Sequence, residues 1–148
     1  MNADSGQFLW ISRLTSFFWY FSMGTPVARN GKVYVTDLDW YSYAGYIKCF
    51  NGQTGNPIWS KKIGFSFGCP ALSDESVYIS GLDFYGYSAY LYNLNANTGT
   101  TIWKTPLDIY SFYTLFSSPT CSKDYIFMGG GEFFSYSKSI VCYDKDTG

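Results

Sequence analysis

The sequence predicts an all-β protein made of about three repeats, each of which folds into a small antiparallel sheet. Two observations predict this fold: an aromatic-rich composition and a motif that returns at a nearly constant interval. The 148 residues include 15 Tyr, 13 Phe and 5 Trp, so that 22% of the chain is aromatic. Aromatic residues are enriched in strands, where flat rings pack on a pleated surface. With 47% hydrophobic and only 14% charged residues, the chain is too apolar to remain disordered.

The recurring motif is a polar turn that ends in Gly and is followed four residues later by Trp. The Gly of its four copies is found at Gly6, Gly55, Gly99 and Gly148. The intervals are 49, 44 and 49 residues, and Trp10, Trp59 and Trp103 follow the first three copies in constant register. Self-similarity at such a period indicates an architecture of stacked structural units. No stretch of the chain shows helical periodicity.

Each repeat is expected to contain four short strands joined by hairpins. A β-type run begins seven residues after a Pro in each repeat, at Val33, Val77 and Ile126. Another run precedes each turn that ends in Gly, and a further strand carries the Trp. On this basis residues 7–14 are the fourth strand of a preceding unit. The repeats cover residues 24–63, 68–107 and 117–148, and the last of them lacks its outer strand.

Four antiparallel strands in 44 to 49 residues have the size of one β-propeller blade. A blade has two apolar faces and must bury them on its neighbours, so one blade alone is not stable. We therefore predict a single segment over residues 1–148, a partial β-propeller of about three four-stranded antiparallel blades. Propellers close with roughly four to eight blades. Two interpretations stay open: a piece of a longer propeller, or copies that assemble head to tail, two of them giving six blades.

The repeated Trp and Gly residues are expected to be structural. Trp10, Trp59 and Trp103 have large rings suited to the gap between adjacent blades, with the indole N–H donating to a backbone acceptor. Gly55 and Gly99 suit a turn between the third and fourth strands, where Gly adopts a positive φ. These five residues are the predicted blade clamps.

The same residues resemble the tryptophan-docking motif of the PQQ-like β-propeller repeat family. That motif runs small residue, x, Asp or Asn, x, x, Thr, Gly, three residues, Trp. One copy matches at Cys49, Asn51, Thr54, Gly55 and Trp59, and another at Asn93, Asn95, Thr98, Gly99 and Trp103. The N-terminal copy has Ser5 in place of Thr. The resemblance covers essentially the whole chain and implies a propeller fold.

The resemblance also bears on activity and location. Quinoprotein dehydrogenases of this family bind pyrroloquinoline quinone (PQQ) and calcium, often beside a disulfide between adjacent Cys. This chain has no Cys-Cys pair and no acidic cluster that matches their catalytic base. It is therefore closer to the relatives that bind no cofactor, such as the outer-membrane assembly lipoproteins. Most relatives lie outside the cytoplasm, which implies a periplasmic, secreted or cell-surface location.

Charge and missing residue types exclude several other functions. A net charge of −1 provides no basic field for nucleic acid. The absence of His excludes histidine-based enzyme mechanisms. The N-terminus has no signal-peptide pattern, and no apolar run approaches the roughly 20 residues of a membrane helix. The four cysteines are expected to be buried thiols, with a disulfide or metal site as alternatives: Cys49, Cys69, Cys121 and Cys142.

The hairpins between the second and third strands repeat the pattern acid, ring, ring, small residue, Tyr. Their aromatic residues form the candidate binding face: Trp40, Tyr41, Tyr43, Phe84, Tyr85, Tyr87, Phe133, Phe134 and Tyr136. The connections from each fourth strand to the next first strand reach the same end and add further rings, among them Phe65, Phe67 and Phe116. Nearby acids are expected to cap hairpin amides or face solvent, with a calcium site as the alternative: Asp37, Asp39, Asp83 and Glu132.

These observations predict a non-catalytic module that acts as a protein-binding or assembly scaffold through its aromatic end. An exposed surface rich in aromatic rings is more often an interaction site than a surface that faces only solvent. The expected partner is another protein or further copies that complete the ring, with no cofactor. The alternatives are a carbohydrate-binding surface module, part of a PQQ-dependent dehydrogenase with calcium, or rings that pack only on one another.

Overall fold

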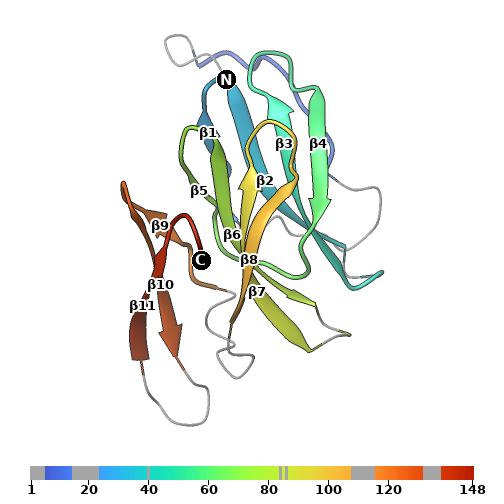
Figure 1. Ribbon diagram of the computed structural model, residues 1–148. Coiled ribbons are helices and arrows are strands. Elements are labelled where there is room, and N and C mark those ends of the chain that lie inside the picture. The colour runs from blue at the N-terminus through green and yellow to red at the C-terminus, as the bar shows by residue number, and fades with distance from the viewer. Residues whose placement is uncertain are drawn as a thin grey trace.

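A computed structural model describes residues 6–14, 24–39, 41–83, 85, 87–107, 116–131 and 138–148. These residues form three antiparallel sheets and no helix (Figure 1). Consequently, the part of the chain described contains no helix of the length and apolarity required to cross a membrane. The prediction of an all-β, partial propeller is confirmed.

The first sheet is a meander in which each strand pairs with the next along the chain. Its strands are β1 (Val27–Arg29), β2 (Lys32–Asp39), β3 (Ala44–Asn51) and β4 (Pro57–Lys62). The two residues between β1 and β2, Asn30 and Gly31, both have positive φ, at 51° and 72°. A two-residue turn with two positive φ angles matches the twist of a hairpin, and Asn-Gly favours it. The pairing of β3 with β4 shifts register between Cys49 and Phe50.

The second sheet repeats this order, and the third has three strands. The second contains β5 (Ala71–Leu72), β6 (Ser76–Asp83), β7 (Ser88–Asn95) and β8 (Thr101–Leu107). The third contains β9 (Thr120–Cys121), β10 (Tyr125–Gly131) and β11 (Lys138–Asp144). A register shift also occurs between Asn93 and Leu94, so the first two sheets have the same irregularity at the same position of the repeat. Each of the segments 24–63, 68–107 and 117–148 contains one sheet.

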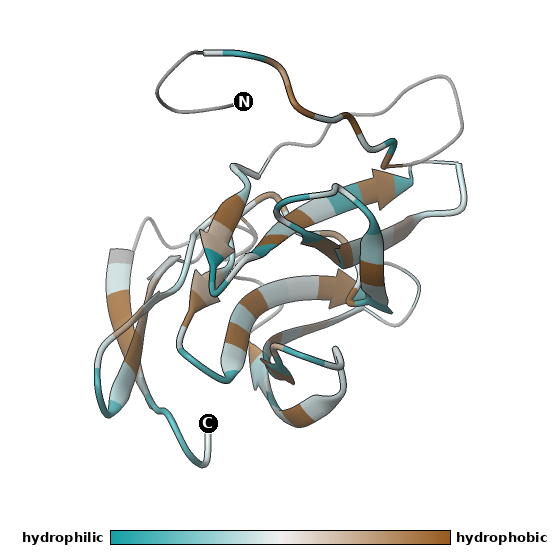
Figure 2. Cartoon of the chain, turned by 90° about the horizontal axis from the view of Figure 1, so that it is seen from above, coloured by the Kyte–Doolittle hydropathy of each residue, from teal (hydrophilic) through white to brown (hydrophobic). Residues whose placement is uncertain are grey.

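The sheets pack face to face through two hydrophobic clusters. One joins the first and second sheets and includes Ile47, Val77 and Ile79, and the other joins the second and third and includes Tyr78 and Ile126. Successive residues of β6 therefore enter different clusters, as the alternation of side chains along a strand requires. Figure 2 shows brown, hydrophobic positions spaced along the strands of the sheets. The second sheet is buried on both faces, which is the blade behaviour that the repeat predicts.

The N-terminal segment differs from the prediction. Residues 7–14 were expected to form a fourth strand, but residues 6–14 form no strand in the structure. A fourth strand requires a third strand of its own blade beside it, and none of the described strands pairs with this segment. The segment instead contacts the first sheet through side chains, because the indole N–H of Trp10 donates to the carbonyl of Gly52 over 3.0 Å.

All four cysteines are free thiols, and their burial differs from the prediction. Cys49 is buried, and burial raises its pKa to about 11. Cys69 and Cys121 are half-buried. The expectation of burial is wrong for Cys142, which is exposed. Cys142 on β11 corresponds to Cys49 on β3, but no sheet of the described chain covers that face of β11.

Candidate functional site

The hairpin between β2 and β3 is held by the carboxylate of Asp39. One oxygen, Oδ1, accepts the backbone N–H groups of Tyr41 and Ser42 over 3.0 and 3.3 Å, and the Ser42 hydroxyl donates to Oδ2 over 2.5 Å. These hydrogen bonds, led by the Ser42 hydroxyl, hold the pKa of Asp39 below its usual value. The prediction that acids in these hairpins cap backbone amides is confirmed at Asp39.

The described residues of two hairpins share one backbone feature. Tyr43 and Tyr87 end the turns before β3 and β7, and both adopt the left-handed region, with φ of 48° and 47°. Non-glycine residues seldom occupy this region. Its recurrence shows that the last residue of the turn has the same backbone conformation in both blades. Three of these rings are largely exposed: Tyr41 at 88%, Tyr85 at 71% and Tyr87 at 74%.

One tyrosine links the two hairpins. The ring of Tyr43 contacts that of Tyr85 edge to face, with centroids 5.8 Å apart and an interplanar angle of 74°. On its other side Tyr43 contacts the ring of Phe65 at 6.3 Å. Edge-to-face pairs at such distances are favourable arrangements of aromatic rings. Tyr43, which is 42% exposed, therefore joins the two hairpins, while Tyr41, Tyr85 and Tyr87 are the more exposed rings at the same end, which we name the tyrosine end.

Among the described residues of the connections between blades, one predicted ring is buried. Phe65 is buried at 3% exposure because its backbone bridges Leu82 and its ring lies against Tyr43. The expectation that Phe65 belongs to the exposed face is wrong. Phe67 and Phe116 stack in parallel, with centroids 4.7 Å apart. The other predicted face residues lie outside the described residues: Trp40, Phe84, Phe133, Phe134 and Tyr136.

The opposite end of the blades is polar. Asn51 Oδ1 accepts the N–H groups of Gln53 and Thr54, and Asn95 and Asp144 make the same pair of bonds in the next two repeats. Neighbouring blades are bridged there by polar side chains. Arg29 donates to Asp74 over 2.7 Å, and Lys32 donates to Asn97 over 2.6 Å. The two ends of the blades are thus chemically distinct.

The repeated tryptophans join successive repeats at this polar end. Trp10 donates its indole N–H to the carbonyl of Gly52, Trp59 to that of Ala96 and Trp103 to that of Lys145, over 3.0, 3.1 and 3.1 Å. Each ring also lies against the Gly that ends the turn. A Cβ on Gly55 would be 2.5 Å from the Trp10 ring, and a Cβ on Gly99 would be 2.6 Å from the Trp59 ring. Each ring requires a glycine beneath it.

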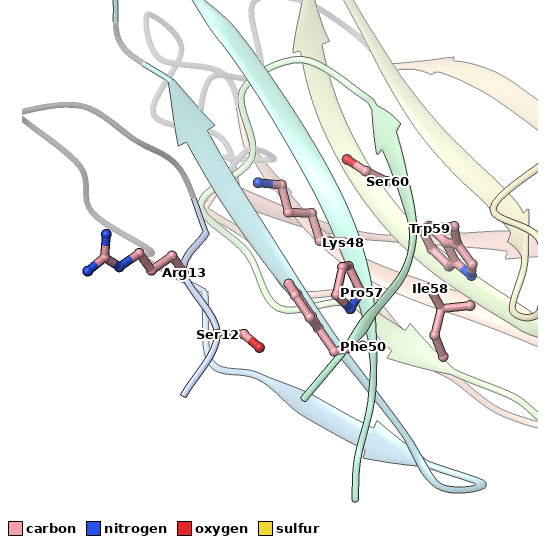
Figure 3. Close-up of a pocket in the computed structure, with 8 residues that line it drawn as sticks. All are labelled: Ser12, Arg13, Lys48, Phe50, Pro57, Ile58, Trp59 and Ser60. Carbon is pink, nitrogen blue, oxygen red and sulfur yellow. The ribbon is translucent and has the colours of Figure 1, made fainter. Parts of the chain in front are cut away.

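A groove of about 610 Å³ lies between the N-terminal segment and the first sheet (Figure 3). It is lined by Ser12, Arg13, Lys48, Phe50, Pro57, Ile58, Trp59 and Ser60. Figure 3 shows Ser12 and Arg13 on a separate segment across from the strands that carry the other residues. The groove is therefore a space between a sheet face and a segment that covers it only partly.

A buried ion pair beside this groove was not predicted. Lys48 Nζ lies 2.5 Å from Asp37 Oδ2, and the Asp37 side chain is only 2% exposed. Lys48 also donates to the carbonyl of Leu14. The register of the second sheet places Gly81 and Tyr92 at the matching positions, so a comparison of the repeats would have singled out the pair. Asp37 thus lies beside a cation. Among the described residues, no group of three or more Cys, Asp or Glu side chains is placed to hold a metal ion.

Consecutive antiparallel sheets joined by docked tryptophans define a set of PQQ-like β-propeller blades. A family model described as outer membrane protein assembly factor BamB matches residues 1–148. The chain belongs to this family.

Solved structures with the same fold include an assembly factor and dehydrogenases. BamB from Moraxella catarrhalis has a TM-score of 0.59 at 17% identity, over 85% of this chain and 34% of that one. A europium-containing methanol dehydrogenase has a TM-score of 0.61 at 18% identity, over 88% of this chain and 25% of that one. The quinohemoprotein alcohol dehydrogenase from Comamonas testosteroni has a TM-score of 0.62 at 21% identity, over 88% and 21%.

At these identities the likeness concerns the fold. The chain spans about a third or less of the length of each of these proteins. A sequence search of curated proteins finds no match.

Proposed function

We propose that the chain is a non-catalytic module that binds a protein partner, in the manner of an assembly scaffold, through its tyrosine end. The observation that carries the proposal is the exposure of Tyr41, Tyr85 and Tyr87 on two neighbouring hairpins, each of which ends in a Tyr of positive φ. Tyrosine offers a rigid, amphipathic contact area at low entropic cost and is enriched where proteins bind one another. The family and one structural neighbour, BamB, point in the same direction, because the family is described as an assembly factor.

The contacts that hold the two hairpins in place favour a binding role for the exposed rings over packing of the rings only on one another. Asp39 fixes the turn that carries Tyr41, and Tyr43 braces Tyr85 from the neighbouring blade. A surface held in place before it binds loses less conformational entropy on association. The exposed rings are therefore presented by a scaffold that is already ordered.

The test is site-specific photo-crosslinking. A photoreactive phenylalanine is placed at position 85, and at position 102 as the control, because Ile102 is also exposed, at 53%, but lies on the outer strand β8. We expect position 85 to yield one dominant cross-linked protein in an extract of the source cells. Position 102 should not capture that protein. Cross-linking that is equal at the two positions would contradict the proposal.

A triple substitution completes the experiment. Tyr41→Ser, Tyr85→Ser and Tyr87→Ser together should abolish capture of that partner by a second probe on a neighbouring hairpin residue, with the melting temperature nearly unchanged, because the replaced rings are exposed. Unfolding would show that the rings serve the core instead. Capture of a glycan by the unmodified protein, with no protein partner, would favour the carbohydrate-binding alternative.

A further inference from the structure

Two tyrosine rings from neighbouring blades contact each other at the tyrosine end. Tyr43 precedes β3 in the first blade, and Tyr85 lies between β6 and β7 in the second. Their ring centroids are 5.8 Å apart, and the rings meet edge to face at 74°. A phenol is readily oxidised by one electron. The contact therefore brings two oxidisable groups of different blades together.

Both rings of this pair are open to a reagent in solution. Tyr85 is 71% exposed and Tyr43 is 42% exposed. On its other side Tyr43 contacts Phe65, which is itself buried, with ring centroids 6.3 Å apart. Tyr85 has room to turn toward Tyr43, because exposed side chains change rotamer rapidly. One ring of the pair is thus held against the core, and the other can adjust to it.

Two phenols in contact can be joined by a carbon–carbon bond. Each phenol first loses one electron and one proton and becomes a tyrosyl radical, whose unpaired electron lies partly on the Cε carbons next to the oxygen-bearing carbon. The two radicals pair their electrons in a new bond between a Cε of one ring and a Cε of the other. The hydrogen on each joined carbon then leaves as a proton and each oxygen gains a proton, which restores both aromatic rings. The net loss is two electrons and two protons, and hydrogen peroxide accepts them to give two molecules of water.

The folded chain favours this pair over a second pair of contacting tyrosines. Holding two reactants together turns an encounter between molecules into a step within one molecule. Tyr90 and Tyr92 have ring centroids 6.0 Å apart, but both are half-buried on one strand, β7. The Lys104 ammonium lies 4.1 Å from the centroid of the Tyr90 ring, and a positive charge there opposes the removal of an electron. Tyr43 with Tyr85 is therefore the more reactive pair.

We propose that Tyr43 and Tyr85 are a site of oxidative modification, at which a one-electron oxidant of the peroxidase class joins them as dityrosine. The new bond links the first blade to the second at the tyrosine end. At the polar end the same two blades are already joined by the hydrogen bond from Trp59 to the Ala96 carbonyl. Coupling thus ties the two blades at both ends and fixes the relative positions of the hairpins that carry the exposed rings.

The test is oxidation of the dilute, purified chain by hydrogen peroxide and a haem peroxidase. We expect the blue fluorescence of dityrosine, an intact mass lower by two hydrogen atoms, and migration as a single chain in a denaturing gel. Peptide mapping should place the bond between Tyr43 and Tyr85. The same treatment in concentrated urea should not yield this bond, because the unfolded chain does not hold the two rings together.

Single substitutions identify the two rings. Tyr43→Phe and Tyr85→Phe should each remove most of the fluorescence of the single-chain product, because a phenylalanine ring forms no phenoxyl radical. Tyr41→Phe and Tyr87→Phe are the matched controls, because these rings belong to the same hairpins and are exposed at 88% and 74%. The control substitutions should leave the yield unchanged. All four variants keep the aromatic ring, so folding should survive, and circular dichroism checks it.

Several results would overturn the proposal: no coupling, a bond mapped to other tyrosines, products that only join separate chains, or equal losses from the paired and the control substitutions. Formation of the same bond in urea would also overturn it, because the folded contact would then play no part. Photo-crosslinking of a partner from position 85 is measured on a chain that has not been oxidised. The tests of this site and of the proposed function can therefore fail independently.

Discussion

Gly99→Ala tests how the blades are joined. Gly99 has a φ of +71°, and a Cβ there would lie 2.6 Å from the Trp59 ring, closer than real Cβ contacts. The left-handed conformation costs an L-residue roughly 1–2 kcal/mol. Overpacking against a ring held by its own hydrogen bond adds roughly 1–3 kcal/mol. The free energy of unfolding should therefore fall by roughly 2–5 kcal/mol, which lowers Tm by roughly 4–20 °C for a protein of this size.

Gly31→Ala is the matched control. Gly31 has nearly the same φ, +72°, but a Cβ at this position would meet nothing within 4 Å. Only the conformational part of the cost applies, about 1–2 kcal/mol. Urea unfolding of both variants gives the difference, which measures the contact between the turn and the tryptophan.

Repeating the measurement in a Trp59→Leu background separates the effect of the Trp59 ring from that of the backbone. With Trp59→Leu in place, Gly99→Ala should cost little more than Gly31→Ala, because the atoms that the new Cβ meets are gone. A double-mutant cycle yields this coupling directly. The reasoning would be refuted if Gly99→Ala and Gly31→Ala lowered the free energy of unfolding equally in the natural background. It would also be refuted if Trp59→Leu left the loss caused by Gly99→Ala unchanged.

Two further predictions concern buried polar groups. Tyr34→Phe removes a 3.1 Å hydrogen bond to the Ala96 carbonyl and should cost about 0.5–1.5 kcal/mol in urea unfolding. Burial raises the pKa of Tyr34 from 10.0 to about 12, so its contribution to stability is complete below pH 10 and is lost as pH rises to about 12. Stability measured against pH should lose this alkaline step in the variant, and an unchanged profile would contradict the assignment. Lys48→Met leaves the carboxylate of Asp37 buried beside an apolar chain and should cost about 3–5 kcal/mol. Asp37→Leu combined with Lys48→Met should recover most of that loss, and a double variant as unstable as the single one would argue against the pair.

The blades could be predicted because their signals are local and repeat. A Trp at a constant distance from a turn Gly specifies the hairpin between the third and fourth strands, and the structure contains this hairpin twice, as β3 with β4 and as β7 with β8. Residues 7–14 carry the same signal, but a strand also needs a partner edge, which a linear motif does not contain. Local pattern therefore specified the side-chain docking of Trp10 and not the pairing of its backbone.

The site could be predicted only in part. The capping role of Asp39 follows from its position at the start of a turn. The burial of Phe65 depends on a single backbone bridge to Leu82 from the neighbouring blade, and no periodicity in the connecting segment indicates it. Asp37 and Lys48 lie on the paired strands β2 and β3, and Lys48 is two residues along β3 from the residue directly opposite Asp37. Contacts of this kind depend on register, which becomes visible only when strands are paired.

The receiving partner of each docked indole is a main-chain carbonyl, supplied by Gly52, Ala96 and Lys145 in turn. Residues as unlike as glycine and lysine serve equally, because the side chain at that position takes no part in the bond. A joint of this type tolerates wide divergence in the surrounding residues and demands only a correctly shaped turn. Blades can thus be duplicated or exchanged without inventing a new complementary surface, which is consistent with a shared architecture at only 17% to 21% identity.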